Sequence, residues 1–213
     1  MIERSVSSTA TLALAGACWI LAIHQSSGMD MGASTELGSF TFFVAAWVSM
    51  MAAMMLPGAV PAVSRYVRAD GRLRAVPQFV GSYIVVWTLV GLAVYAVYRP
   101  HSTSIAGVLV IAAGAYELTP FKRDCRRRCR ESVSSGSRFG LYCVGSSIGL
   151  MVMLVALGVM SVTWMAVVAA VVFVQKLLPP KASVDVALAL AIVGLGVVIL
   201  VTPETVPGLT PAM

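Results

Sequence analysis

Residues 38–62 read GSFTFFVAAWVSMMAAMMLPGAVPA and contain no charged side chain. About 20 apolar residues are enough for a helix to cross the hydrocarbon core of a bilayer, so this stretch predicts a transmembrane helix. Similar apolar stretches recur along the chain, and together the seven occupy about residues 8–25, 38–62, 77–98, 103–120, 139–157, 160–177 and 184–201. The sequence therefore predicts an all-α, polytopic transmembrane helical bundle of about seven spans, with residues 1–213 forming one integral membrane domain.

The composition agrees with a membrane protein. Of the 213 residues, 59% are hydrophobic and only 11% are charged, whereas soluble domains contain about 25% charged residues. The net charge of +6 is compatible with a nucleic-acid partner, but the basic residues fall in short loops between apolar stretches, as topology alone requires. We expect a lipid bilayer around the chain, anionic lipid at the basic loops and no nucleic acid.

The basic residues also predict the orientation. With seven spans, 14 of the 15 Lys and Arg residues fall on one side, and Arg99 falls on the other. Because positive loops face the cytoplasm, the N-terminus is expected inside and the C-terminus outside a bacterial inner (plasma) membrane. The first stretch lacks a small-residue cleavage site, so we expect it to remain as an uncleaved span. Whether the fifth and sixth stretches, which meet at Gly158, both cross fully stays open.

Four methionines mark the second span. Met50 and Met54 are one helical turn apart, as are Met51 and Met55, so two thioether pairs lie on neighbouring helix faces. Thioethers are soft ligands that favour Cu(I). Methionine also fills irregular gaps between packed helices, so copper binding and simple packing are both open interpretations.

A second set of soft donors is expected outside the membrane, where His24, Met29 and Met31 stand within eight residues. Imidazole and thioethers suit copper, although a solvated loop accommodates such residues without any function. If the second helix is continuous, its rise per residue separates this segment from Met50–Met55 too far for one mononuclear site.

Cys125 and Cys129 form a C-x3-C pair in a very basic segment, and Cys143 follows. Neighbouring arginines are expected to lower the thiol pKa and favour the thiolate. The pair is a weak zinc signal, because structural zinc takes four ligands, and the arginines would repel a cation. Since these cysteines are expected on the reducing cytoplasmic side, we predict no disulfide framework. Contact with anionic lipid is the alternative role of this segment.

Glu117 is expected near the inner end of the fourth span. An ionisable residue inside a membrane is a functional candidate, but pairing with Lys122 or a loop arginine explains Glu117 equally well. Asp185, at the start of the last span, is expected at the interface. The sequence contains no catalytic triad, phosphate loop or dinucleotide fingerprint, so we expect no enzymatic activity.

Three ordered blocks of the chain resemble a bacterial family of predicted metal-binding integral membrane proteins. These blocks are Trp47-x2-Met50-x3-Met54-Met55-x-Pro57-x3-Pro61, then Ala113-Gly114-x-Tyr116-x-Leu118-Thr119-Pro120-x-Lys122-x2-Cys125-x3-Cys129-Arg130, and finally Gly140-Leu141-Tyr142-Cys143-Val-Gly145-x3-Leu150-Met151 with its continuation through Gly158, Met160, Trp164, Lys176 and Pro180. The resemblance implies a helical membrane protein that binds a metal.

The chain departs from that family's pattern at several potential ligands. Phe139 stands where the family has His, Ser146-Ser147-Ile148 replaces Cys-Cys-Trp, and Gln175 replaces Glu. The segment between Cys129 and Gly140 is also shorter. The implied metal site therefore retains its methionines and Cys125, Cys129 and Cys143, but lacks the additional thiolates.

Three functions follow from these observations. The first is the binding or handling of copper or another soft metal. The second is an accessory, non-catalytic subunit of a larger membrane complex with other membrane subunits, such as a copper-dependent membrane monooxygenase. The third, a small transporter, is least favoured because the sequence shows no inverted repeat and no paired broken helices.

Overall fold

The computed structural model describes residues 2–26, 38–70, 74–131, 135–158, 161–178 and 182–206. These ranges are helical throughout and contain no strand. In chain order, the helices are α1 (Ile2–Ser26), α2 (Phe40–Asp70), α3 (Ala75–Val97), α4 (Thr103–Glu117), α5 (Pro120–Glu131), α6 (Gly136–Leu157), α7 (Val162–Leu177), α8 (Ala182–Val201) and the short 3-10 helix η1 (Pro203–Thr205).

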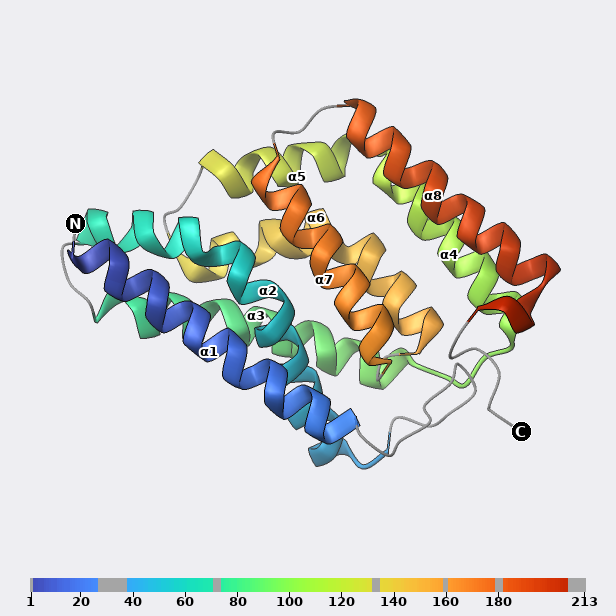
Figure 1. The fold of residues 1–213 in the computed structure, drawn as a ribbon, viewed down its shortest axis with the longest axis horizontal. Coiled ribbons are helices and arrows are strands. Elements are labelled where there is room, and N and C mark those ends of the chain that lie inside the picture. The colour runs from blue at the N-terminus through green and yellow to red at the C-terminus, as the bar shows by residue number, and fades with distance from the viewer. Residues whose placement is uncertain are drawn as a thin grey trace.

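Helices α2 and α6 form the centre of the bundle. Helix α2 packs against α1, α3 and α7, and α6 packs against α3, α4, α5 and α7. Most residues of the apolar stretches of α2 and α6 are buried, whereas only a minority of those of α3 and α8 are. Figure 1 shows α4 and α8 side by side at one edge of the bundle, with α1 at the opposite edge. The exposed faces of α3 and α8 are rich in Val and Leu, as expected of helices that face lipid.

The all-α fold class is confirmed, and several helices are suited to a membrane. Four helices are long and apolar enough to cross one, namely α2, α3, α6 and α8. Helices α4 and α5 meet the same requirement as a pair, although they are bent by 62° at their junction. The two remaining apolar helices, Thr9–Gln25 and Val162–Leu177, are shorter. The helices thus cover all seven predicted stretches, while the count of seven crossings and their orientation stay predictions.

Helix α5 is the main difference from the expected architecture, because the sequence predicted a loop there. Eight of its twelve residues are charged, so α5 by itself lacks the apolar composition of a membrane-spanning helix. Lys122, Cys125, Arg126 and Cys129 are its buried residues. Their spacing of three and four residues is that of one helix face, and this face packs on α6. Helix α2 also continues past residue 62, with Pro57 and Pro61 inside it.

Small residues allow α4 and α8 to approach closely. A Cβ atom on Gly107 of α4 would lie 2.7 Å from Leu200 Cδ2, and one on Gly196 of α8 would lie 2.6 Å from Ile111 Cγ1. Close backbone approach of this kind is how helices associate in lipid, where burial of apolar surface gives little driving force. A separate contact, between α4 and α6, joins the α4–α8 pair to the rest of the bundle.

Candidate functional site

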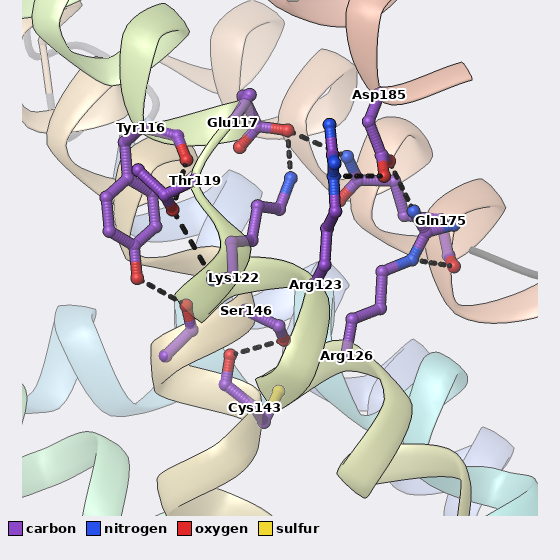
Figure 2. A network of polar contacts seen from close by, with 11 residues as sticks. Tyr116, Glu117, Thr119, Lys122, Arg123, Arg126, Cys143, Ser146, Gln175 and Asp185 are labelled. Carbon is purple, nitrogen blue, oxygen red and sulfur yellow. Dashed lines mark hydrogen bonds and ion pairs between the residues drawn. The ribbon is translucent and has the colours of Figure 1, made fainter. Parts of the chain in front are cut away.

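A buried polar network joins the ends of α4, α5 and α7. The Nζ atom of Lys122 donates to Oε2 of Glu117, and Gln175 Nε2 donates to the same oxygen at 2.9 Å. Glu117 and Lys122 are 0% and 1% exposed. Figure 2 shows both donors converging on the Glu117 carboxylate. Of the two partners that the sequence allowed for Glu117, the structure contains Lys122.

A second buried ion pair ties α5 to the start of α8. Arg126 Nη1 donates to Asp185 Oδ1 at 2.5 Å, and Arg126 Nε donates to the Gln175 carbonyl at 2.9 Å. Asp185 is 2% exposed and lies in the first turn of α8, and its position at the membrane interface stays a prediction. Its burial follows from the pairing with Arg126, because a carboxylate is rarely buried without a charged partner.

The two cysteines of the C-x3-C pair are both buried against α6, but at different places. Cys125 lies over Gly145, where an added Cβ would be 2.6 Å from its Sγ atom. Cys129 lies one turn further on, with its Sγ atom 4.0 Å from the Phe139 carbonyl oxygen. The helix thus presents its cysteines along one face, as the four-residue spacing predicts.

Cys129 and Cys143 are neighbours, although they come from different helices. The pKa of the Cys129 thiol is raised, chiefly by burial and further by the proximity of Cys143. Cys143 is fully buried in α6, and its Sγ atom lies 3.2 Å from the Tyr83 hydroxyl. Burial also raises the pKa of Cys125. Arg128 does lower the pKa of Cys125, as expected, but burial raises it by more, so the expected net decrease is wrong for Cys125 and Cys129.

Lys176 of α7 lies between the methionine-rich helix α2 and the Cys129 thiol. Its Nζ atom lies 4.0 Å from Met55 Sδ and 5.8 Å from the centre of the Phe139 ring. Its aliphatic chain crosses α2 at Gly58, where any Cβ would collide with the lysine Cδ atom. Lys176 also lowers the pKa of Cys129, partly opposing the effect of burial. The Lys176 ammonium group therefore lies beside a thioether, the Cys129 thiol and an aromatic ring.

Two adjoining cavities open beside these side chains. The inner one has a volume of about 50 Å³, and Gly58, Cys129, Phe139, Ser146 and Lys176 are among its lining residues. The outer one has a volume of about 460 Å³, and both are lined by Pro61, Arg65, Arg130 and Lys176. Because these four residues belong to both, the outer cavity is the mouth of the inner one. We call the outer cavity the basic mouth.

The basic mouth contains uncompensated positive charge. Among the described residues, its lining consists of Arg65, Arg68, Arg130 and Lys176, together with Val60, Pro61, Ser64 and Leu177, and includes no carboxylate. Arg65 Nη1 donates to the Arg130 carbonyl, and Arg130 Nη1 donates to the Leu178 carbonyl at 2.7 Å. In the described part of the chain, none of the four cations forms an ion pair, whereas five ion pairs occur on the other basic residues of α5.

The other predicted ligands lie elsewhere. Met50, Met51 and Met54 are at most 3% exposed and belong to the hydrophobic core. His24 is exposed near the end of α1, and Ser49 donates a hydrogen bond to the neighbouring Gln25 at 2.9 Å. The end of α1 is therefore level with the start of the methionine segment, closer than the sequence predicted. Met29 and Met31 lie outside the described residues.

The structure brings together only part of the predicted ligand set. Met55 and Cys129 lie beside Lys176, Cys143 lies near Cys129, and Cys125 lies one turn away on α5. No group of three or more His, Cys, Asp and Glu side chains within the described ranges is arranged to hold a metal. The set therefore does not suit zinc, which takes four N, S or O ligands. Soft sulfur donors in small number are the chemistry of Cu(I).

Sequence reasoning missed the role of Lys176 and Tyr83. Lys176 was named only as part of the family pattern, and no role was assigned to Tyr83. A lysine near the end of an apolar stretch carries a signal, because its long side chain reaches from the helix toward polar surroundings. No local signal connects Tyr83 with Cys143, which are 60 residues apart.

Comparison with known proteins adds the family. No curated protein and no solved structure matches the chain. A family model described as "PpoB2: Copper chaperone" matches residues 44–199, a range that includes the methionine segment, the residues that line the basic mouth, and Cys125, Cys129 and Cys143. This match covers most of the chain, extends from α2 to α8 and associates the protein with copper. The chain belongs to the PpoB2 copper chaperone family.

Proposed function

We propose that this protein handles copper within a bacterial inner membrane and holds Cu(I) between the sulfur atoms of Cys129 and Cys143, with Met55 as an additional soft donor. The observation that carries the proposal is the position of Met55 and Cys129 beside Lys176, with the buried Cys143 close enough to Cys129 to influence its thiol. Thiolates and thioethers select Cu(I) among the metals available to proteins. The family assignment supports copper as the cargo.

Lys176 provides a positive charge that can balance the negative charge of the proposed Cu(I) site. Two thiolates around one Cu(I) ion carry a net negative charge, which is costly in a buried position. The ammonium group of Lys176 provides the compensating charge at this place, since it acts on the Cys129 thiol. The raised pKa of Cys129 means that the thiol is protonated without metal at neutral pH, so Cu(I) binding displaces a proton.

Seven crossings with the N-terminus in the cytoplasm are the topology we propose. Figure 1 supports alternating helix directions, with the end of α2 and helix α5 at one side and the end of α8 at the other. The basic mouth then opens to the cytoplasm, where thiols stay reduced. A periplasmic reporter enzyme fused after residue 206 should be active, whereas one fused after residue 131 should be inactive. The opposite pattern would reverse the orientation.

A direct test is competition for Cu(I) under reducing conditions. The purified protein in detergent should remove Cu(I) from a coloured chelator, and the variant Cys129→Ser/Cys143→Ser should bind at least about tenfold more weakly, since both soft ligands are lost. Cys18→Ser is the matched control, because Cys18 lies in α1 and is absent from the cavity lining. Equal binding by the double variant and the wild type would refute the site.

The role of each methionine is separable by substitution with leucine, which conserves volume. Met55→Leu should weaken Cu(I) binding by a smaller factor than the cysteine changes. Met50→Leu/Met54→Leu should leave it unchanged, because Met55 is the methionine of this core cluster that lies against Lys176, and leucine replaces methionine in a core at little cost. A loss of copper in the Met50/Met54 variant, with Met55→Leu unaffected, would relocate the site along α2.

A further inference from the structure

The basic mouth has features of a binding site that the copper ligands do not explain. Its volume of about 460 Å³ is roughly ninefold larger than the inner cavity of about 50 Å³, so the mouth is much larger than a bare metal ion needs. Arg65, Arg68, Arg130 and Lys176 line it, and no carboxylate does. A free Cu(I) cation would be repelled here, so this charge works against direct entry of the metal ion.

We propose that the basic mouth receives copper as an anionic Cu(I)–thiolate complex of a small carboxylated thiol, from which Cu(I) passes to Cys129 and Cys143. This inference rests on the proposed function, because it needs those cysteines as the acceptor. Cu(I) in a reducing compartment is bound by small thiols. A complex of two thiolates with Cu(I) is an anion, and carboxylates on the thiol add negative charge.

The arrangement of the two cavities gives the order of events. An anionic complex is attracted to a cleft lined by charge of one sign, and Arg65 and Arg130 stand where the mouth meets the inner cavity. Cys129 lines the inner cavity but not the mouth. The complex therefore meets the arginines before it meets the thiol, and only the metal ion is small enough to continue inward.

The transfer itself is a ligand exchange at sulfur. The Cu–S bonds to the donor thiolates break while bonds to Cys129 Sγ and Cys143 Sγ form. The protons of the two cysteine thiols pass to the departing donor thiolates. Copper remains Cu(I) throughout, so no electron is transferred and no oxidant or reductant takes part. Lys176, which borders both cavities, stabilises the thiolate that forms on Cys129.

The four cations of the basic mouth differ from the other basic residues of α5, because none of the four forms an ion pair with a described residue. Arg126 is bound to Asp185 and Lys122 to Glu117, while Arg127 and Arg128 pair with Asp124. Arg68 and Arg130 have backbone carbonyl partners, which leave their positive charge uncompensated. Removing charge at the mouth should therefore affect an anionic ligand, whereas removing it elsewhere on α5 should not.

The experiment compares two copper donors and two charge variants of the protein in neutral detergent. One donor is Cu(I) bound to glutathione, a thiol with carboxylates, and the other is Cu(I) bound to cysteamine, a thiol with an ammonium group. The variant Arg68→Gln/Arg130→Gln removes two charges from the mouth. Arg127→Gln/Arg128→Gln removes two charges from the exposed face of α5 and is the matched control. Stopped-flow measurement gives the rate of copper transfer.

We expect Arg68→Gln/Arg130→Gln to slow transfer from the glutathione complex by about tenfold, a typical size for electrostatic steering, and to leave the cysteamine rate unchanged or raised. The control variant should match the wild type with both donors. Added salt should slow only the glutathione reaction, because exposed charges are screened. Arg68→Lys/Arg130→Lys, which keeps the charge, should restore the rate.

Three results would overturn the inference. Equal slowing with both donors would indicate a structural role for the arginines, and no slowing with glutathione would exclude their contact with the donor. Loss of the effect in vesicles of anionic lipid, with its retention in neutral lipid, would identify the mouth as a headgroup site. If the wild type takes copper from neither donor and binds none in the chelator assay, the proposed function itself fails.

Discussion

The two sides of helix α5 handle positive charge in opposite ways. Toward α4 and α8, Lys122 and Arg126 are buried and bound to Glu117 and Asp185. Toward α2 and α7, Arg130 joins Arg65, Arg68 and Lys176 around an open cavity without a carboxylate. The first arrangement fixes helices to one another, because a buried charge must be paired. The second leaves charge available, and we infer that an arriving anion uses it.

The largest effect should come from breaking the paired side. Asp185→Ala leaves Arg126, which is 4% exposed, buried without its carboxylate. Removal of one partner of a buried pair typically costs about 3–5 kcal/mol, so the free energy of unfolding should fall by that amount. Unfolding of the purified protein by denaturing detergent, followed by circular dichroism, would measure the change.

Asp124→Ala is the control for this loss. Asp124 pairs with Arg127 and Arg128, whose side chains are 64% and 53% exposed. Exposed pairs contribute about 0–1 kcal/mol, so the control should remain close to the wild type. Similar losses in the two variants would show that burial does not separate these ion pairs.

A smaller effect is expected for the reactivity of the Cys129 thiol, which lies between the two sides of α5. Burial and Cys143 raise the pKa of Cys129, and Lys176 lowers it. The thiolate fraction at neutral pH is therefore small. As long as the pH is below the thiol pKa, the rate of Cys129 alkylation should rise about tenfold for each unit by which the pH is increased. Lys176→Met removes the lowering influence, so the thiol pKa rises further and the rate at fixed pH falls several-fold. Mass spectrometry of the labelled peptide gives both rates.

This experiment has a clear contrary outcome. If alkylation of Cys129 is fast and independent of pH between about 6 and 8, the thiolate is already formed and its pKa is low. The positive charge of the arginines would then outweigh burial, as the sequence alone had indicated. Lys176→Arg keeps the charge and should leave the rate near that of the wild type.

The smallest effect concerns the glycine that accommodates Lys176. Gly58→Ala adds a methyl group where the lysine chain crosses α2. Because the lysine side chain is flexible, we expect it to move aside, with little change in stability and a reduction of up to a few-fold in Cys129 alkylation. Gly81→Ala, which meets nothing within 4 Å, is the matched control. An unchanged alkylation rate would show that the position of Lys176 does not depend on Gly58.

The apolar stretches of the sequence predicted the positions of most helices, but the charged residues did not predict helix α5 or its polar contacts. All seven apolar stretches are helical, because run length and hydropathy are local properties of the chain. The helix α5 was missed, since its charge suggested a loop and only the spacing of Lys122, Cys125, Arg126 and Cys129 indicates a buried face. Charge composition hides such a face when the buried residues are themselves charged.

The candidate site was predicted as residue types but not as a location. Met55, Cys129 and Cys143 were all candidates, yet nothing local to the sequence selects them from Met50, Met54 or Cys125. The selection depends on the packing of α2, α5, α6 and α7 and on Lys176, whose contact with Met55 joins residues 121 positions apart. Whether these residues bind metal stays a prediction, as do the partner subunits and the absence of enzymatic activity.

The pairing of Arg126 with Asp185 has a consequence for the order in which the protein is made. Lys122 follows its partner Glu117 by five residues, but the partner of Arg126 is synthesised 59 residues later. Until α8 is in place, a nascent chain holds an arginine whose buried position has no carboxylate. Addition of the last helix therefore supplies the missing partner at this end of the bundle. Chains that stop before residue 185 lack that partner, which gives the cell's proteases a means to recognise them.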